Sequence, residues 1–262
     1  MSWKPIVVVS VALLLGASCT SSPSSKRISP QSPRARSPAP ATPEPSPAAS
    51  ASGYHPTITR ADFVQRIDNP YLPWIPGTTY VFRGIKDGES QRDEVVVTDR
   101  TKLILGVTCV VVTDTATHAD KLLEKTEDWY AQDKDGNVWY FGEDTASYDE
   151  KGHVESREGS WEAGVDDAQP GIVMPAHPQV TESHRQEFYQ GQAEDMFWIV
   201  SLGRSVKVPY GNFKDVMETL EWTPLEPKVI DTKFYAAGVG VILEVAAAGD
   251  KERAELVSVT KP

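Results

Sequence analysis

From Gly77 onward, the chain alternates short runs of β-branched and aromatic residues with glycine, proline or charged turns. Runs of this kind predict strands. They lie at residues 78–83, 94–98, 103–105, 107–113, 128–131, 138–141, 182–189, 195–202, 205–208, 215–222, 229–235, 239–245 and 254–259. We therefore predict an all-β (β-dominated) domain whose antiparallel strands form a curved sheet or open barrel, because a sheet of about a dozen strands does not stay flat.

Three turn regions add detail to this pattern. Gln132-Asp133-Lys134-Asp135-Gly136-Asn137 separates two strand runs and predicts a hairpin, since glycine adopts positive φ freely. The same residues carry oxygen ligands, but the loop is too short for an EF-hand calcium loop and lies between strands. Lys151-Gly152 predicts a second hairpin turn, and the four runs after residue 214 predict an antiparallel meander.

The segment before the first strand has a different pattern. Residues 62–67 predict one or two helical turns, with Thr59 as the N-cap. The next segment has three prolines between positions 70 and 76, so it is predicted to be extended and turning.

The N-terminus predicts export. Lys4 precedes an apolar run from Ile6 to Leu15, which spans about 15 Å as a helix and is too short to cross a bilayer. This pattern predicts a signal peptide over residues 1–18. Leu15-Gly16-Ala17-Ser18-Cys19 resembles the lipobox of bacterial lipoproteins, in which the cysteine carries acyl chains such as palmitate; here Leu15 lies one position further from Cys19 than usual. The alternative is a secreted protein cleaved near Ala17.

The composition then defines a tether and one domain. Residues 20–52 contain 10 Ser, 8 Pro and 6 Ala in 33 positions, too few apolar groups to offset the entropy of ordering. We predict a lipid-anchored, disordered tether over residues 19–52, followed by a single β-rich domain at 53–262.

The net charge of the chain excludes one class of partner. The net charge is −11, and residues 53–262 alone hold 21 basic and 36 acidic side chains. This balance predicts no nucleic-acid partner. With Cys19 acylated, Cys109 has no disulfide partner and is predicted to be a buried apolar residue. No phosphate-binding loop, nucleophile elbow or Cys-x-x-Cys pair is present, so no cofactor is predicted.

Several motifs together resemble one family. The first is Asn69-Pro70-Tyr71-x-Pro73-x-x-Pro76-Gly77, and the last is Tyr235-Ala236-x-Gly238-Val239-Gly240. Between them lie Asp128-Trp129-Tyr130-Ala131-Gln132 and Gly136-Asn137-Val138-Trp139-Tyr140. The chain resembles a family of uncharacterised exported bacterial lipoproteins with this start and end to a β-rich domain. The resemblance covers about residues 69–260 and implies export and a lipid anchor, but no activity.

Acidic and histidine residues form two weak candidates for metal binding. Nine carboxylates fall between residues 143 and 167, and they predict a solvated loop face, with a hard-cation site as the alternative. His153, His177 and His184 lie within 32 residues but lack a compact ligand spacing. No metal site is predicted.

Aromatic residues give the best indication of binding. Adjacent aromatics on a strand point to opposite faces, so one set builds the core. The other set lines a groove, packs under loops or contacts a partner. The candidate ligand-binding residues are Trp129, Trp139, Tyr140 and Trp198. Candidate acids for hydrolysis are Glu187, Glu194 and Asp195, with cross-strand ion pairing to Arg185 as the alternative.

These observations predict an extracytoplasmic, monomeric lipoprotein held at the bacterial cell membrane through Cys19. It is predicted to bind a lipid or other apolar or amphiphilic ligand, or an envelope partner. A carboxylate-dependent envelope hydrolase and a structural scaffold module remain as alternatives, so enzyme activity is left open.

Overall fold

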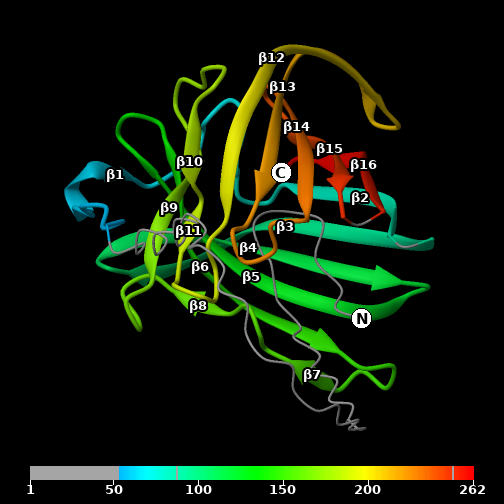
Figure 1. Cartoon of the computed structure of the whole chain (residues 1–262), viewed down its shortest axis with the longest axis horizontal. Coiled ribbons are helices and arrows are strands. Elements are labelled where there is room, and N and C mark those ends of the chain that lie inside the picture. The colour runs from blue at the N-terminus through cyan, green and yellow to red at the C-terminus, as the bar shows by residue number, and fades with distance from the viewer. Residues whose placement is uncertain (1–52, 87, 250) are drawn as a thin grey trace, which may run out of the picture.

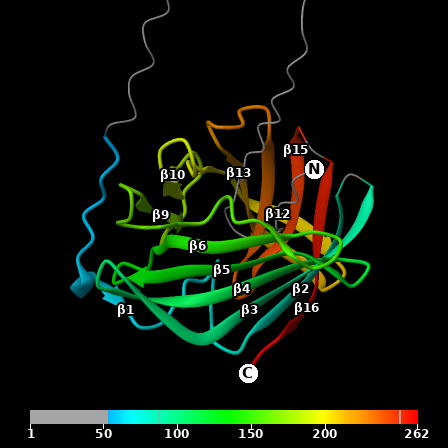
Figure 2. The ribbon, with the colours of Figure 1, turned by 90° about the horizontal axis from the view of Figure 1, so that it is seen from below.

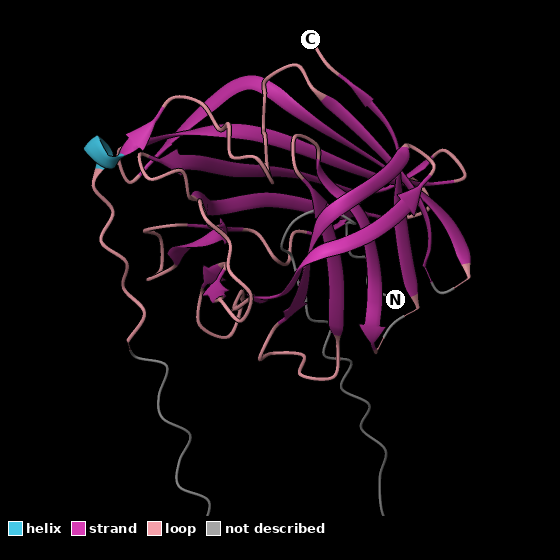
Figure 3. Ribbon diagram, turned by 90° about the horizontal axis from the view of Figure 1, so that it is seen from above, coloured by secondary structure: helices cyan, strands magenta, loops and turns pink. Residues whose placement is uncertain are grey.

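A computed structural model describes residues 53–86, 88–249 and 251–262 (Figure 1). Within these ranges the chain is almost entirely strand, and the predicted all-β class is confirmed (Figure 3). The described part holds no helix that is long and apolar enough to cross a membrane.

The elements, in chain order, are the 3-10 turn η1 (Arg60–Asp62), β1 (Phe63–Val64), β2 (Thr79–Lys86), β3 (Glu89–Ile104), β4 (Val107–His118), β5 (Lys121–Asp133), β6 (Val138–Tyr148), β7 (Val154–Ser156), β8 (Trp161–Glu162), β9 (Gln169–Met174), β10 (Ser183–Arg185), β11 (Glu187–Phe188), β12 (Met196–Val208), β13 (Gly211–Trp222), β14 (Ile230–Ala236), β15 (Gly240–Ala248) and β16 (Glu252–Thr260).

All of these strands belong to one antiparallel sheet. Its order is β10-β12-β13-β14-β15-β16-β2-β3-β4-β5-β6-β9-β11, so the last strand of the chain pairs with the first long one. In Figure 2, β3 to β6 lie side by side, while β13 and β15 stand across them. Long strands twist, and this twist curves the sheet round a single core.

Two short strands bring the ends of the sheet together. β10 pairs with β12 at one end of the order, and β11 pairs with β9 at the other, with only Gln186 between them in the chain. The backbone N–H of Gln186 donates to the Asp195 carbonyl at 2.8 Å. The sheet is therefore nearly closed into a barrel, which confirms the predicted curved sheet or open barrel.

The antiparallel order gives the barrel two distinct ends. We call the end with the β2–β3, β4–β5, β13–β14 and β15–β16 turns the polar mouth. The opposite end, with the β3–β4, β5–β6 and β14–β15 turns, is the plugged end, because the segment 69–77 covers it. The Gly238 N–H donates to the Pro70 carbonyl at 2.7 Å. Trp74 packs against Tyr80 and Tyr130, with ring centroids 5.6 and 5.9 Å away.

Some predicted elements are confirmed and others are corrected. The hairpin turn at 132–137 joins β5 to β6, with Gly136 at φ 97°, and the final meander is β13 to β16. The predicted helical turns at 62–67 were wrong: η1 ends at Asp62 and β1 follows, where Phe63 pairs with Asp133.

Strand lengths differ most from the prediction. The runs at 94–98 and 103–105 belong to a single β3, and those at 195–202 and 205–208 to a single β12, because bulges absorb the irregular residues. Residues 114–127 carried no strand prediction, yet β4 extends to His118 and β5 starts at Lys121. Polar residues on both faces of these strands hide the alternation that marks a strand.

We expect the plug to contribute strongly to stability. Trp74 is 3% exposed, so Trp74→Ala should lower the free energy of unfolding by about 3–5 kcal/mol through lost packing and a cavity. Trp198→Ala is the matched control: the ring is 40% exposed, and the loss should stay within about 0.5 kcal/mol. Urea denaturation of the two variants measures both values, and equal losses would contradict the assignment of Trp74 to the plug.

Candidate functional site

The register of the strands places a set of carboxylates on the inner face of the sheet. Residues paired directly across neighbouring strands point to the same face. Three such rows cross β2 to β6: Val97-Val112-Asp128-Glu143, Val95-Asp114-Thr126-Thr145 and Phe82-Asp93-Ala116-Glu124. Every member of the three rows is buried, so this face points into the barrel.

We call the five acids of these rows the inner acidic band. Its members are Asp93 on β3, Asp114 on β4, Glu124 and Asp128 on β5 and Glu143 on β6, each 7% exposed or less. Carboxylates are rarely buried unless they are paired, so five on one face are unusual for a structural core.

Hydrogen bonds satisfy part of the band. The Tyr140 hydroxyl donates to Asp128 Oδ1 at 2.8 Å, and Gln91 Nε2 donates to Asp93 Oδ1 at 3.0 Å. Asp114 differs from both: among the described residues neither of its carboxylate oxygens makes a hydrogen bond of good geometry, and the nearby Thr115 N–H only lowers its pKa, as the smallest of the effects on it. It is 1% exposed and lies at the centre of the band.

Burial makes these acids hard to ionise. It raises the pKa of Asp93 to about 8 and the pKa of Glu124 to about 7. Burial also holds the pKa of Asp114 well above its ordinary range, and the negative charges of Asp93, Asp128 and Glu124 raise it further. Burial raises the pKa of Asp128 in the same way, against the hydrogen bond from Tyr140. The band therefore holds protons that these groups lose in water at neutral pH.

A second polar group, the Lys233 cluster, lies on β13 to β15 and contains a directly paired cation. Lys233 Nζ lies 2.9 Å from Glu221 Oε2, and the Tyr235 hydroxyl donates to Glu221 Oε1 at 2.9 Å. Burial lowers the pKa of Lys233, but the charges of Glu221 and Glu244 outweigh it and leave the pKa well above its usual value. This cluster thus holds a buried cation by direct pairing.

The polar mouth carries a third charged group. Lys86 Nζ lies 3.1 Å from Glu252 Oε2, and the two residues are direct partners where β2 and β16 meet. Lys86 also lowers the pKa of Asp93 and Glu124 through its positive charge, although burial remains the larger effect on both.

The acid candidates from the sequence divide into a pair and a turn residue. Glu187 and Asp195 lie close enough to interact, and burial followed by the charge of Asp195 raises the pKa of Glu187 well above its usual range. Glu194 accepts a hydrogen bond from the Gly191 N–H at 2.8 Å and lies 3.9 Å from Arg185. Glu194 therefore stabilises the turn before β12, while Glu187 and Asp195 lie where the barrel closes.

The four aromatic candidates do not lie together. Tyr140 is completely buried on the inner face, where its ring stacks on Tyr130 at 4.9 Å. Trp129 lies on the opposite face of β5, and Lys102 Nζ covers its ring at 3.2 Å.

The other two tryptophans also lie away from the inner face. Trp139 donates from Nε1 to Asp133 Oδ2 at 2.8 Å and packs edge-on against Phe63. Trp198 is 40% exposed on β12, next in sequence to the buried Phe197. Much of the outer aromatic surface is therefore covered by the chain itself, one of the arrangements that the sequence left open.

The remaining sequence candidates have local roles. No group of three or more His, Cys, Asp or Glu side chains suited to a metal ion occurs in the part of the chain that the structure describes. Asp133 accepts hydrogen bonds from both the backbone and the side chain of Asn137, as a turn requires. Cys109 is fully buried, as predicted, and burial raises the pKa of its thiol. Cys19 lies outside the described residues.

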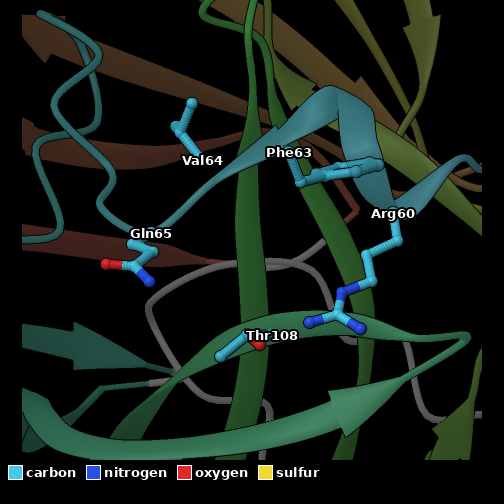
Figure 4. Close-up of a pocket in the computed structure, with 5 residues that line it drawn as sticks. All are labelled: Arg60, Phe63, Val64, Gln65 and Thr108. Carbon is cyan, nitrogen blue, oxygen red and sulfur yellow. The ribbon is translucent and has the colours of Figure 1, made fainter.

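A small surface pocket lies beside β1. It has a volume of about 170 Å³ and is lined by Arg60, Phe63, Val64, Gln65 and Thr108. Figure 4 shows the Arg60 side chain extending from η1 towards Thr108 on β4. None of the candidate residues lines this pocket.

Comparisons with known proteins show only a distant likeness. No protein-family model matches the sequence, and no curated protein matches it. A protein of Bacteroides fragilis, described as exported and as having a YmcC-like fold, is 14% identical with a TM-score of 0.39. A lipoprotein structure from Parabacteroides distasonis is 11% identical with a TM-score of 0.41. Each match covers 73% of this chain and 99% of the other.

Sequence reasoning missed most of the inner acidic band. Glu143 was noted only as part of an acidic loop face, and Asp93, Asp114 and Glu124 were not singled out. The signal is present as polar residues at every second position, such as Gln91 and Asp93. It is weak because the residues between them are charged too.

The raised pKa values predict that stability falls as the pH rises. Below about pH 4, Asp93 and Glu124 are protonated in both the folded and unfolded states, so they add no penalty. Between about pH 4 and 8 the unfolded chain releases these protons while the fold retains them, because the folded pKa values are about 8 and 7. Asp93→Asn should therefore flatten this decline, as measured by urea denaturation at several pH values.

The control for this measurement is Asp99→Asn, on the same strand but exposed. It should leave the slope of stability against pH unchanged. A slope that is the same in the wild type and in Asp93→Asn would contradict the buried, protonated state of Asp93.

Proposed function

We propose that this protein is an extracytoplasmic, monomeric lipoprotein, anchored through Cys19, whose curved sheet binds an amphiphilic ligand on its inner face. One observation carries the proposal: apolar and carboxylate side chains share the same rows of the same concave face. Val97 and Val112 precede Asp128 and Glu143 in one row.

The distribution of these side chains along the barrel axis supports an amphiphile. Toward the plugged end, Ile104, Val107 and Trp74 are buried and apolar. Toward the polar mouth, Lys86 and Glu252 lie at the ends of their strands. Binding sites combine an apolar lining with a few placed polar groups, and a molecule with one apolar and one polar end fits this gradient.

The four aromatic candidates differ in whether they lie on the proposed ligand-binding face. Tyr140 is the one that belongs to the ligand-binding face, because Trp129 and Trp139 lie on the opposite face under Lys102 and Phe63. Trp198 is exposed on the outside and remains a candidate contact for an envelope partner.

Fewer observations support the two alternative functions, a hydrolase and a scaffold module. A hydrolase would use the Glu187–Asp195 pair, whose raised pKa at Glu187 suits a general acid. Glu194 is less suited because its carboxylate already holds the turn at Gly191. A pure scaffold gains most from an apolar core and has no need of a carboxylate such as Asp114 inside it.

The anchor has a direct test. In an exporting bacterial host, Cys19→Ser should move the protein from the membrane fraction to the soluble fraction, because acylation contributes about 0.8 kcal/mol for each buried CH₂. The released chain should also lack the mass of the acyl chains. Cys109→Ser is the control and should stay in the membrane fraction. Equal membrane retention of both variants would contradict the anchor at Cys19.

Ligand binding is tested on the full, exported chain carrying Cys19→Ser. We expect it to bind the neutral apolar dye N-phenyl-1-naphthylamine, seen as a fluorescence increase. Thr145→Phe places a ring on the inner face and should weaken binding about tenfold, the effect of losing one good contact. Thr126→Val removes a hydroxyl from the same row with little change in volume. It should therefore weaken dye binding less than Thr145→Phe does.

Trp198→Ala is the outer-face control, and its dissociation constant for the dye should stay within about twofold of the parent value. Circular dichroism establishes that each variant is folded. Dye binding that depends on Trp198 and not on the inner-face variants would overturn the placement of the site. No binding of the dye and no copurifying amphiphile would overturn the proposed function.

A further inference from the structure

The buried part of the domain holds far more acidic than basic side chains. Among the described residues, ten acidic side chains are buried and only two basic ones, both lysines. Lys233 is already held by Glu221 and Glu244, and Lys86 by Glu252. The inner acidic band on β3 to β6 thus has Lys86 at its edge as its nearest buried cation, and that lysine is shared.

On these strands the exposed carboxylates have basic partners, whereas the buried carboxylates, which need partners more, have few. Carboxylates on the outer face, which water can solvate, have arginine partners: Glu94 with Arg92 at 2.6 Å and Glu127 with Arg100 at 2.8 Å. Asp114, on the inner face, is buried, and neither of its oxygens makes a hydrogen bond of good geometry with another described residue; the Thr115 N–H contributes only the smallest of the effects on its pKa. An exposed carboxylate does not need a partner, whereas a buried one does.

Asp114 is also surrounded by band members rather than by cations. Asp93, Asp128 and Glu124 all lie near enough to raise its pKa by their charge. A protein could relieve this crowding by replacing Asp114 with an apolar residue, which often costs nothing in stability. The retained carboxylates therefore form a place where a positive group would gain several partners at once.

We propose that the inner acidic band binds the cationic group of an amphiphile, an ammonium or guanidinium carried on an apolar body. This inference rests on the proposed function and names the charge of its ligand. Asp114 and Asp128 contact the cationic group, and the apolar residues of the same rows, such as Val112, contact the apolar body.

An organic cation fits the band better than a metal ion does. A metal requires three or more ligands converging on one point, and no such group occurs among the described residues. An ammonium group donates hydrogen bonds in several directions, and carboxylates spread along neighbouring strands can accept them.

The band lies within reach of the polar mouth. Glu124 is three residues from the start of β5, and Asp93 is four residues from the start of β3, both at the end where the β2–β3 and β4–β5 turns lie. The opposite end is covered by the segment that contains Trp74. A ligand would enter through the polar mouth.

The test compares three amphiphiles with the same twelve-carbon tail, each below its micelle concentration, on the full chain carrying Cys19→Ser. The probes are dodecylammonium (cationic, with three N–H donors), dodecyl maltoside (neutral) and dodecanoate (anionic). Isothermal titration calorimetry at pH 8 should give the cation at least about tenfold tighter binding than either of the others, the gain expected from charge-assisted contacts.

Single substitutions then test whether the preference for the cation depends on the inner acidic band. Asp114→Asn keeps the shape of the side chain but cannot release a proton to become a carboxylate when the cation binds, so the preference for the cation should fall to about threefold or less. Asp128→Asn should act in the same direction. Asp99→Asn makes the same chemical change at an exposed position of β3 and should leave the preference intact. Preferences that are equal in Asp114→Asn and Asp99→Asn would overturn the assignment to the band.

The outcomes separate this inference from the function on which it rests. Equal binding of all three probes, or tighter binding of dodecanoate, would overturn the cation preference and leave amphiphile binding intact. Binding of none of the probes would overturn both. Cation binding that Asp114→Asn weakens and Asp99→Asn does not would support both.

Discussion

The cross-strand register that links β12 to β6 through the β16–β2 pair is the constraint on which the rest of this structure depends. Each cross-strand pair fixes the face of its two residues, so Leu256, Phe82 and Asp93 must point inward together. A slip of one residue at any pair would turn one half of the inner face outward. The register therefore places the apolar core residues and the inner carboxylates on the same face. A change of register that turned one set outward would also turn the other outward.

Burying ionisable side chains on that surface costs free energy, and the two halves of the barrel offset this cost in different ways. On β13 to β15, Lys233 pairs directly with Glu221, and the charge of Glu244 also favours its charged form. On β3 to β6 the band has no such lysine at its centre, and burial shifts the pKa of Asp114 far upward instead. The first arrangement offsets the cost of burial by direct pairing. In the second, the carboxyl groups hold protons, which the proposed cationic ligand would replace.

The sequence predicted the fold class and several turns, because those depend on local patterns. Gly136 and the oxygens of Asp133 determine the β5–β6 turn, and both can be read from the chain. The extent of β4 and β5 could not be predicted, because the end of β4 and the beginning of β5 carry polar residues on both faces. The site was harder still: Asp114 and Asp99 look alike in sequence, and only the register shows that one is buried and the other exposed.

The aromatic residues show why a sequence pattern alone does not identify an uncovered binding surface. A ring on the outer face of a sheet suggests a binding surface only if nothing in the chain covers it. Lys102, which lies over Trp129, and Phe63, which packs on Trp139, come from distant parts of the sequence and could not be paired with them beforehand. Natural sequences depart from the rules of stability mainly at functional sites. In this barrel the buried carboxylates are the clearest such departure, which is why the proposed binding role rests on the polar residues of the inner face and not on the tryptophans.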